Sequence, residues 1–321
     1  MTESAVPRFH KPGLPPAGRC VLGLIAAGPL VCGGLVGALR ARADPAVLVS
    51  HGGRGAVGAA VAYGFPTAET DPVTVLAHPG INAVLVAGGG RATGPMAARA
   101  VRAGKAVLAE PPLVAEEAHL ETLEAAVAAG PGFLVPALPG RFGREAGRAA
   151  RRVRRAGGAR VVSVRAPAGR LGAMTLVRLL DLALYLADAA PATVRATPTR
   201  RGLTTVVELA GGGRILCALG GAPDGPARLE AMTPARTVTL DGAPVMAETE
   251  GTARWDAGTR ALAAGFTRAA ATGAPPLSAA AALAATRVAL AARRGGGRLD
   301  TSNTETQAMP HPPVPGPEAR P

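Results

Sequence analysis

Short apolar runs alternate with longer amphipathic stretches through the first half of the chain. Runs of Val, Leu and Ile bounded by glycine, proline or aspartate are typical of buried strands, and the alanine-rich stretches between them have helical periodicity. The predicted strands lie at 20–25, 46–50, 82–87, 106–109 and 132–137. The predicted helices lie at 30–42, 54–63, 72–77, 93–103, 115–129 and 143–156. This alternation predicts a doubly wound parallel sheet of the Rossmann type.

Two local signals mark where helices of this half begin and end. Asp71 precedes Pro72, and an aspartate cap followed by proline in the first turn favours a helix start. Gly104 follows the predicted helix at 93–103, and glycine allows the left-handed conformation that commonly ends a helix. We therefore interpret Lys105, the next residue, as an ordinary residue of the turn.

The second half has a different order of predicted strands and helices. It opens with a predicted strand at 160–166 and a strongly apolar helix at 174–188. Short predicted strands follow at 193–198, 204–210, 213–219, 226–232 and 236–240, and alanine-rich helices follow at 256–272 and 279–293. This pattern predicts an α+β domain in which a mostly antiparallel open sheet is backed by helices.

The predicted fold class is therefore α/β, with two domains between polar ends. We predict a Rossmann-type domain at 19–140 and an α+β substrate or oligomerisation domain at 141–300. Residues 1–18 and the proline-rich residues 301–321 have the composition of disordered segments.

Residues 20–39 carry no charge, so they allow three interpretations. They are long enough to cross a bilayer, but their glycines make them weakly hydrophobic and the break at Gly28-Pro29 divides them as a strand, turn and helix would require. A secretory signal with a small-residue cleavage site at 41–43 is the third interpretation. Because strands and helices alternate directly afterwards, we favour the strand, turn and helix and expect no membrane segment.

Composition limits the kind of core and the kind of site. Hydrophobic residues make up 48% of the 321 residues and aromatic residues only 2%, so Ala, Val and Leu must build the core. Cys20, Cys32 and Cys217 are too few and too dispersed for a disulfide framework or a zinc site. We therefore expect no metal site and a reducing, cytoplasmic location.

The formal net charge of +13 comes almost entirely from arginine, because the chain has only two lysines. On the predicted helix at 143–156, arginines recur on one face at Arg144, Arg148, Arg152 and Arg155. This face is either simply solvated or a site for an anion. Nucleic acid is not the expected partner, because no aromatic side chains interleave with these arginines for base stacking.

The apolar helix at 174–188 carries a narrow polar stripe formed by Arg178, Asp181, Tyr185 and Asp188. A helix that is apolar nearly all round is buried, so the stripe should face a cleft or a polar interface. It is either a set of paired residues at the domain seam, with Arg178 and Asp181 as an ion pair, or a working site. In a working site, Asp181 and Tyr185 would carry protons, and Arg178 would hold an anionic substrate or stabilise an oxyanion.

Three further stretches make the chain similar to the Gfo/Idh/MocA family, the glucose–fructose oxidoreductase and inositol dehydrogenase group. Residues 64–84 resemble the family's second and third strand region, residues 103–113 resemble the stretch with its Glu-Lys-Pro motif, and residues 266–300 resemble its closing helices. The resemblance implies NAD(P)-dependent hydride transfer to or from a small-molecule sugar, polyol or related carbonyl compound. It also implies a homo-oligomer that associates through the outer face of the second sheet.

The resemblance also implies which residues line the cofactor. They are Ala26, Gly28, Pro29, Ser50, Arg54, Gly88 and Glu110. The family's glycine loop usually begins with Gly-x-Gly, and Ala26 replaces its first glycine. The acid that normally follows the second strand and binds the adenosine ribose is replaced by Ser50, with Arg54 nearby. Either NADP or NAD is expected, and NADP is favoured because no carboxylate repels its 2′-phosphate.

The positions that would do the chemistry depart further from the family's pattern. The family's lysine corresponds to Pro111, and the histidine of its His-x-x-Asp motif corresponds to Arg178, while the aspartate is kept as Asp181. Two hypotheses follow. The chain is an oxidoreductase with impaired or altered catalysis, or it is a catalytically inactive relative that acts as a nucleotide-binding partner or regulatory subunit.

Overall fold

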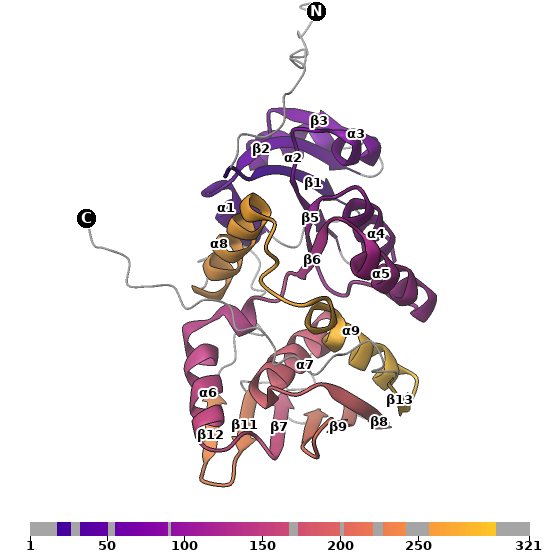
Figure 1. The fold of residues 1–321 in the computed structure, drawn as a ribbon. Helices are drawn as coiled ribbons and strands as arrows, with labels where there is room; N and C mark the ends of the chain where they lie inside the picture. The colour runs from indigo at the N-terminus through magenta and orange to yellow at the C-terminus, as the bar shows by residue number, and fades with distance from the viewer. Residues whose placement is uncertain are drawn as a thin grey trace, which may run out of the picture.

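The first half of the chain forms a six-stranded sheet in which all neighbouring strands are parallel (Figure 1). The computed structural model describes residues 18–26, 33–50, 55–88, 91–166, 173–199, 202–220, 227–241 and 257–299. The strands are β1 (Val21–Ala26), β2 (Asp44–Ser50), β3 (Thr67–Glu69), β4 (Ala83–Ala87), β5 (Ala106–Ala109) and β6 (Phe133–Pro136). Their order is β3-β2-β1-β4-β5-β6, which confirms the predicted doubly wound sheet.

Helices cover both faces of this sheet. They are α1 (Gly33–Arg40), α2 (Ala56–Tyr63), α3 (Pro72–Ala77), α4 (Thr93–Arg102) and α5 (Glu117–Ala129). Because successive side chains of a strand point to opposite faces, Leu24 of β1 joins one buried cluster with Leu35 of α1, and Ile25 joins another with Leu123 of α5. The strand residues are buried on both faces, and the alternating direction of their side chains divides the helices into two layers.

The predicted helix signals act as expected. The Asp71 carboxylate accepts a hydrogen bond from the backbone N–H of Val73 at 2.9 Å, and Pro72 occupies the first turn of α3. Gly104 has a φ of 76°, and its N–H donates to the Val101 carbonyl at 3.0 Å after the end of α4. The edge strand β3 was not predicted, because three half-buried residues are too short to produce a pattern.

The second sheet has seven strands and mostly antiparallel pairing. Its strands are β7 (Val161–Ala166), β8 (Pro191–Thr199), β9 (Gly202–Leu209), β10 (Arg214–Leu219), β11 (Arg228–Met232), β12 (Thr237–Asp241) and β13 (Gly296–Arg298). Their order is β12-β11-β7-β10-β9-β8-β13, and only the pair of β7 with β10 is parallel. The predicted open sheet is confirmed, with the short β13 added at one edge.

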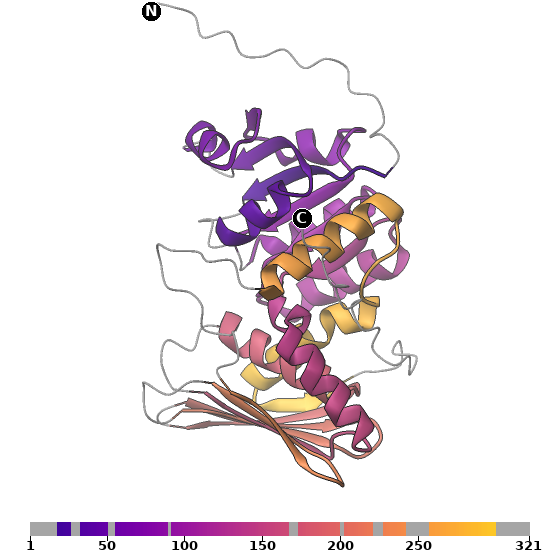
Figure 2. The ribbon, with the colours of Figure 1, turned by 90° about the vertical axis from the view of Figure 1, so that its left-hand side faces the viewer.

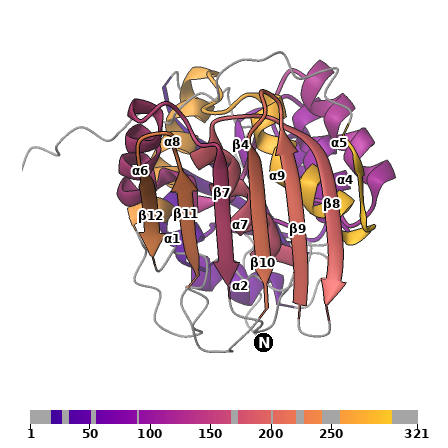
Figure 3. The same cartoon turned by 90° about the horizontal axis from the view of Figure 1, so that it is seen from below.

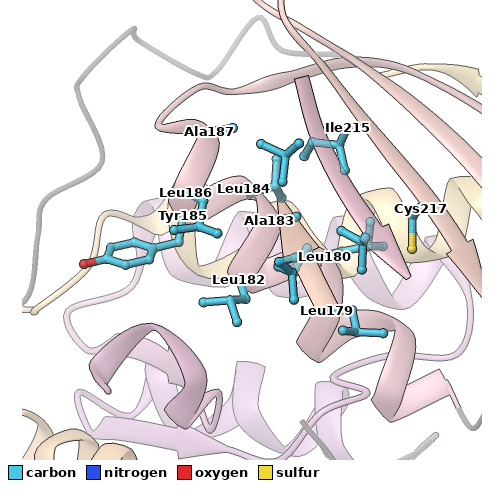
Figure 4. Packing of buried hydrophobic residues seen from close by; sticks show 14 of the residues in the cluster. Leu179, Leu180, Leu182, Ala183, Leu184, Tyr185, Leu186, Ala187, Ile215 and Cys217 are labelled. Atoms are coloured by element: carbon cyan, nitrogen blue, oxygen red, sulfur yellow. The ribbon is translucent and has the colours of Figure 1, made fainter. Parts of the chain in front are cut away.

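Helices lie on the inner face of the second sheet, toward the first sheet (Figure 2). They are α6 (Arg144–Arg155), α7 (Ala173–Ala187) and α9 (Ala279–Arg293), and the short 3₁₀ helix η1 (Pro139–Phe142) precedes α6. In the described part of the chain no helix lies on the outer face of this sheet (Figure 3). Leu179, Leu180 and Leu184 of α7 are fully buried among strand residues such as Ile215 (Figure 4), so α7 is the buried helix that its composition predicts.

The helix α8 (Ala257–Thr272) belongs by position to the end of the chain but packs against the first sheet. Its Phe266 is fully buried and meets Phe133 of β6 edge to face, with 6.5 Å between ring centroids. Buried residues of α8 and α1 share one hydrophobic cluster. The layer on this face of the first sheet is therefore completed by the C-terminal part of the chain.

The helix α9 joins the two sheets. Leu283 and Leu290 pack in a cluster of the first sheet, whereas Val288 packs in the cluster of the second. The guanidinium of Arg287 donates from Nε to Glu124 of α5 at 3.1 Å, which fixes α9 beside α5.

None of the described helices is long and apolar enough to span a membrane. The expected strand of the uncharged stretch at 20–39 is β1, and the expected helix is α1, while the turn between them lies outside the described residues. The terminal segments expected to be disordered also lie outside them, apart from Gly18.

Candidate functional site

Four of the residues predicted to line a cofactor lie at one edge of the first sheet. Ala26 ends β1 and Ser50 ends β2, while Gly88 directly follows β4 and Glu110 directly follows β5. Because these strands are parallel, all four positions lie at their carboxyl ends. The strand order reverses between β1 and β4, and ligands of open α/β sheets bind outside the carboxyl ends at such a point. The other predicted residues, Gly28, Pro29 and Arg54, lie outside the described residues.

A hydrogen bond joins the ends of β4 and β5. The backbone N–H of Gly88 donates to Oε2 of Glu110 at 2.8 Å, and Glu110 is only 3% exposed. Gly88 has a φ of 107°, a conformation that glycine adopts readily and other residues rarely do. The carboxylate of Glu110 therefore fixes the start of the loop after β4, next to the point where the strand order reverses.

A carboxylate that the sequence analysis did not single out lies near the end of β2. Glu69 ends β3 and is half-buried, and the strand register places it opposite Val49, one residue before Ser50. Neighbouring strands are about 4.8 Å apart. The position at the end of β2 therefore lacks an acid, but an acid ends the next strand. Only the three-residue strand β3 brings Glu69 there, which is why its sequence context gave no signal.

Lys105 lies at the opposite edge of the sheet. It precedes β5, whereas Glu110 follows it, and its ammonium donates to the backbone carbonyls of His78 at 2.8 Å and Ile81 at 2.7 Å. Burial lowers the pKa of Lys105. Its role is to hold the turn before β4. Pro111, which follows Glu110, is buried and carries no titratable group.

Asp181, a member of the polar stripe of α7, is paired with Arg141 of η1. Nε of Arg141 donates to Oδ2 of Asp181 at 2.9 Å, and Nη2 of Arg141 contacts Oδ1 of the same carboxylate. Arg141 and Asp181 are each 1% exposed. The expectation that Asp181 pairs with Arg178 is thus wrong. The spacing on α7 was consistent with that pair, but a residue forty positions away in sequence provides a bidentate partner.

Tyr185 and Asp188 continue this arrangement. We define the polar seam as the buried residues Arg141, Asp181 and Tyr185 together with the half-buried residues Arg154 and Asp188. The guanidinium carbon of Arg141 lies 6.0 Å from the ring centroid of Tyr185, within the range of a cation–π interaction. Nη1 of Arg154, on α6, lies 4.0 Å from Oδ2 of Asp188. The seam therefore joins α7 to η1 and α6.

Burial controls the titration of the two predicted proton carriers. It raises the pKa of the Asp181 carboxyl, although Arg141 acts in the opposite direction. It also raises the pKa of the Tyr185 hydroxyl, against the effect of nearby Arg154 and Arg141. Both side chains are at least 95% buried, so both are shielded from solvent as well as engaged by arginine.

Arg178 is the member of the predicted site that is closest in position to the amino end of α7. It is half-buried and lies one helical turn before Asp181. The helix η1 begins three residues after β6, the last strand of the first sheet. Because Asp181 pairs with Arg141 of η1, this part of α7 lies close to the end of β6. Arg178 is therefore the predicted catalytic residue whose side chain retains partial exposure.

The sequence offered one signal for Arg141. It is the only charged residue between Gly130 and Gly143, a stretch with several large apolar residues, so a buried charge with a partner elsewhere in the fold could have been inferred. Among the described residues, no group of three or more His, Cys, Asp or Glu side chains could hold a metal ion.

The chain matches no known family model and none of the curated proteins. Its fold is that of solved Gfo/Idh/MocA-like oxidoreductases. The myo-inositol dehydrogenase of Lactobacillus casei, in complex with NAD(H) and myo-inositol, matches with a TM-score of 0.73 and 15% identity over 88% of this chain and 97% of that chain.

Two other structures are similar over nearly their whole length. GenD2 of gentamicin A biosynthesis, in complex with NAD, has a TM-score of 0.70 and 20% identity over 92% of this chain and 100% of its own. The aldose–aldose oxidoreductase of Caulobacter crescentus, complexed with glycerol, has a TM-score of 0.69 and 19% identity over 88% of this chain and 100% of its own.

The pairing of Arg141 with Asp181 predicts a specific pattern of stability. We expect Arg141→Met to lower the free energy of unfolding by about 3–5 kcal/mol, because it leaves a buried carboxylate without its partner. The double variant Arg141→Met/Asp181→Leu should recover a large part of the lost free energy of unfolding, because it also removes the carboxylate that was left without a partner. Chemical denaturation of the wild type, both single variants and the double variant measures the coupling.

The pH dependence supplies the control. In Arg141→Met only burial acts strongly on Asp181, so its pKa in the folded protein lies further above the unfolded value. The cost of ionising it is present above that folded pKa and is relieved as the pH falls through it. The deficit of this variant should therefore shrink in acid. Additive losses in the two single variants, with no dependence on pH, would contradict the assignment.

Proposed function

We propose that the chain binds a nicotinamide dinucleotide at the carboxyl edge of the first sheet and acts as an NAD(P)-dependent oxidoreductase with slowed catalysis. The observation that carries this proposal is the convergence of Ala26, Ser50, Gly88 and Glu110 on that edge, at the reversal of strand order. The NAD-bound proteins of the same fold support it. A bound nicotinamide would supply or accept the hydride.

Catalysis is expected to be slow because the residues near the edge cannot move protons easily. Pro111 has no proton to give, and Arg178 stands where the resemblance implies a histidine. Asp181 and Tyr185 are buried against Arg141. General acid–base help is typically worth about 10²–10⁴ in rate, so its loss weakens a reductase without abolishing turnover.

The proposed substrate is a small sugar, polyol or related carbonyl compound that carries an anionic group. Arg178 supports the anionic group, because it is half-buried on the part of α7 that lies below the first sheet. A guanidinium there would bind a carboxylate or phosphate in a bidentate manner.

A second candidate function is a catalytically inactive partner or regulatory subunit that binds the nucleotide but does not turn over. The observation that favours it is the burial of Asp181 and Tyr185, the two side chains that could replace the family's missing proton carriers. This candidate shares the cofactor site with the first and differs from it only in turnover.

The choice between NADP and NAD depends on two side chains at the end of β2 and β3. Ser50 carries no charge that would repel a 2′-phosphate, which favours NADP. Glu69 ends the neighbouring strand and opposes that preference. We propose that NADP is the preferred cofactor. Glu69 lies one strand further away than an acid at the end of β2 would, so its repulsion of the 2′-phosphate is weaker.

A thermal-shift titration with NADPH, NADH and their oxidised forms tests the cofactor. Ligand at a hundred times its dissociation constant stabilises by about 2.7 kcal/mol, so saturable binding raises the melting temperature. We expect the larger shift with NADPH. Ser50→Asp should reduce the NADPH shift and spare the NADH shift, because it places a carboxylate at the end of β2, while Ser50→Asn is the uncharged control.

Two outcomes would count against this cofactor assignment. Absence of a shift with all four dinucleotides would exclude both candidate functions. A larger shift with NADH, with Glu69→Gln raising the response to NADPH, would reverse the proposed preference.

Turnover separates the two candidate functions. Arg178→His supplies a group that can carry a proton near neutral pH. We expect it to raise the rate of NADPH oxidation, measured with a panel of sugar and polyol-derived carbonyl compounds, by about tenfold or more over wild type. Arg178→Gln removes the charge without supplying a proton carrier and should give no increase. If wild type and both variants bind NADPH without turnover, the inactive partner is the better account.

We propose that the outer face of the second sheet is covered by a second copy of the chain. Leu216 of β10 and Met232 of β11 are 39% and 40% exposed on that face, which no described helix covers. Leu216→Glu should convert a dimer or tetramer into smaller species in analytical ultracentrifugation. Val61→Glu, at an exposed apolar residue of α2, is the control that should leave the mass unchanged. A wild-type protein that sediments as a monomer would exclude this assembly.

The proposed location is the cytoplasm. Cys20 and Cys217 are free thiols buried in different hydrophobic clusters, which fits a reducing compartment. Burial raises the pKa of each to about 12, so both stay protonated and unreactive. Cell fractionation checks the assignment.

A further inference from the structure

The helix α6 carries a row of arginines that the proposed reaction does not use. Arg144, Arg148, Arg152 and Arg155 are all exposed, and we call these four residues the α6 stripe. Viewed down the helix they lie within one narrow arc, because their spacings are four, four and three residues. With a rise of about 1.5 Å per residue, the stripe is about 16 Å long.

The opposite face of α6 fixes the direction of the stripe. Ala146, Ala149, Ala150 and Val153 are buried. They pack in the same cluster as α7 and the inner face of the second sheet. The helix cannot rotate without exposing them, so the arginines point away from this cluster. The helix itself lies beside β12, at one edge of the second sheet (Figure 3).

The stripe has no compensating charge among the described residues. None of its four arginines forms a hydrogen bond or ion pair there, and Glu145 is the only acidic residue of α6. Arginines elsewhere on the surface do find carboxylates, as Arg287 does with Glu124 and Arg294 with Glu117. Asp188, the acid that directly follows α7, lies beside Arg154, outside the stripe.

This arrangement destabilises the isolated helix. Arginines four residues apart repel each other on a helix surface. Arg144 also lies in the first turn, where the helix dipole disfavours positive charge. An anionic partner bound along the stripe would relieve both effects, whereas solvent and salt only screen them.

We infer that the α6 stripe docks an acidic helical segment of another protein. Carboxylates repeating at three and four residues on a partner helix would fall opposite the guanidinium groups, which bind carboxylates in a bidentate manner. Apart from its arginines and one glutamate, α6 has only Ala, Gly and Val. It therefore lacks the aromatic rings that stack on bases. These features favour an acidic protein over nucleic acid.

The test uses the full chain and two variants of equal charge. The stripe variant is Arg144→Gln/Arg148→Gln/Arg152→Gln/Arg155→Gln. The control variant replaces four exposed arginines elsewhere and is Arg42→Gln/Arg99→Gln/Arg195→Gln/Arg268→Gln. Gln has nearly the helix propensity of Arg, so the stripe variant should fold, and its thermal unfolding is measured to verify this.

The probe is a labelled synthetic helical peptide that carries four glutamates on one face at the spacing of the stripe. Fluorescence anisotropy should show binding by wild type that weakens as salt is raised. The stripe variant should bind about tenfold more weakly or worse, and the control variant within about threefold of wild type. A peptide of the same composition with its glutamates scattered around the helix should bind more weakly than the matched peptide.

Three results would overturn the inference. Equal losses in both variants would show that binding follows net charge alone. Retention of binding by the folded stripe variant would place the contact elsewhere. A labelled DNA duplex that binds more tightly than the peptide, and loses its affinity in the stripe variant, would assign the stripe to nucleic acid. Dinucleotide binding is measured on the same samples and is expected to be unchanged, so the result is independent of the proposed function.

Discussion

The buried ion pair between Arg141 and Asp181 sets where the two sheets lie relative to each other. Arg141 lies in η1, which follows the last strand of the first sheet, and Asp181 lies in the helix that fills the inner face of the second. Removing the two charges from water costs several kcal/mol per ion, and their mutual attraction offsets that cost only while the bidentate geometry is kept. The pair therefore tolerates little sliding of one sheet against the other. The same contact holds the Asp181 carboxylate in a buried position at 1% exposure, so one interaction fixes both the link between the sheets and the surroundings of this side chain.

The proposed cofactor site at the carboxyl edge of the first sheet and the proposed catalytic residues differ in how they depend on sequence. The edge is built from strand order, parallel pairing and the backbone conformation of Gly88, which many sequences can provide. Proton transfer depends on single side chains, and Pro111 and Arg178 replace the two that the resemblance implies. A chain can therefore keep the fold of NAD-bound dehydrogenases while its chemistry changes, which is why fold likeness alone does not decide its activity.

Regular elements with a strong pattern were predictable from the sequence, and contacts across the fold were not. The bounds of β5, α3 and α9 match the prediction, because caps, glycines and apolar runs mark them locally. The elements β3, η1 and β13 are three or four residues long and give no periodic signal. The partner of Asp181 and the position of Glu69 depend on pairings that form only when distant segments meet, so local spacing favoured Arg178 and overlooked Glu69.

The packing of α8 has a consequence for the order in which the protein matures. The first sheet is made from the start of the chain, yet one of its faces is closed by Phe266 and its neighbours near the end. During synthesis, that face must remain uncovered until α8 has left the ribosome. Contacts between such distant segments form slowly. Until α8 packs against it, the first sheet exposes an apolar surface. This surface is therefore the part of a newly made chain that is most prone to aggregation and to chaperone binding.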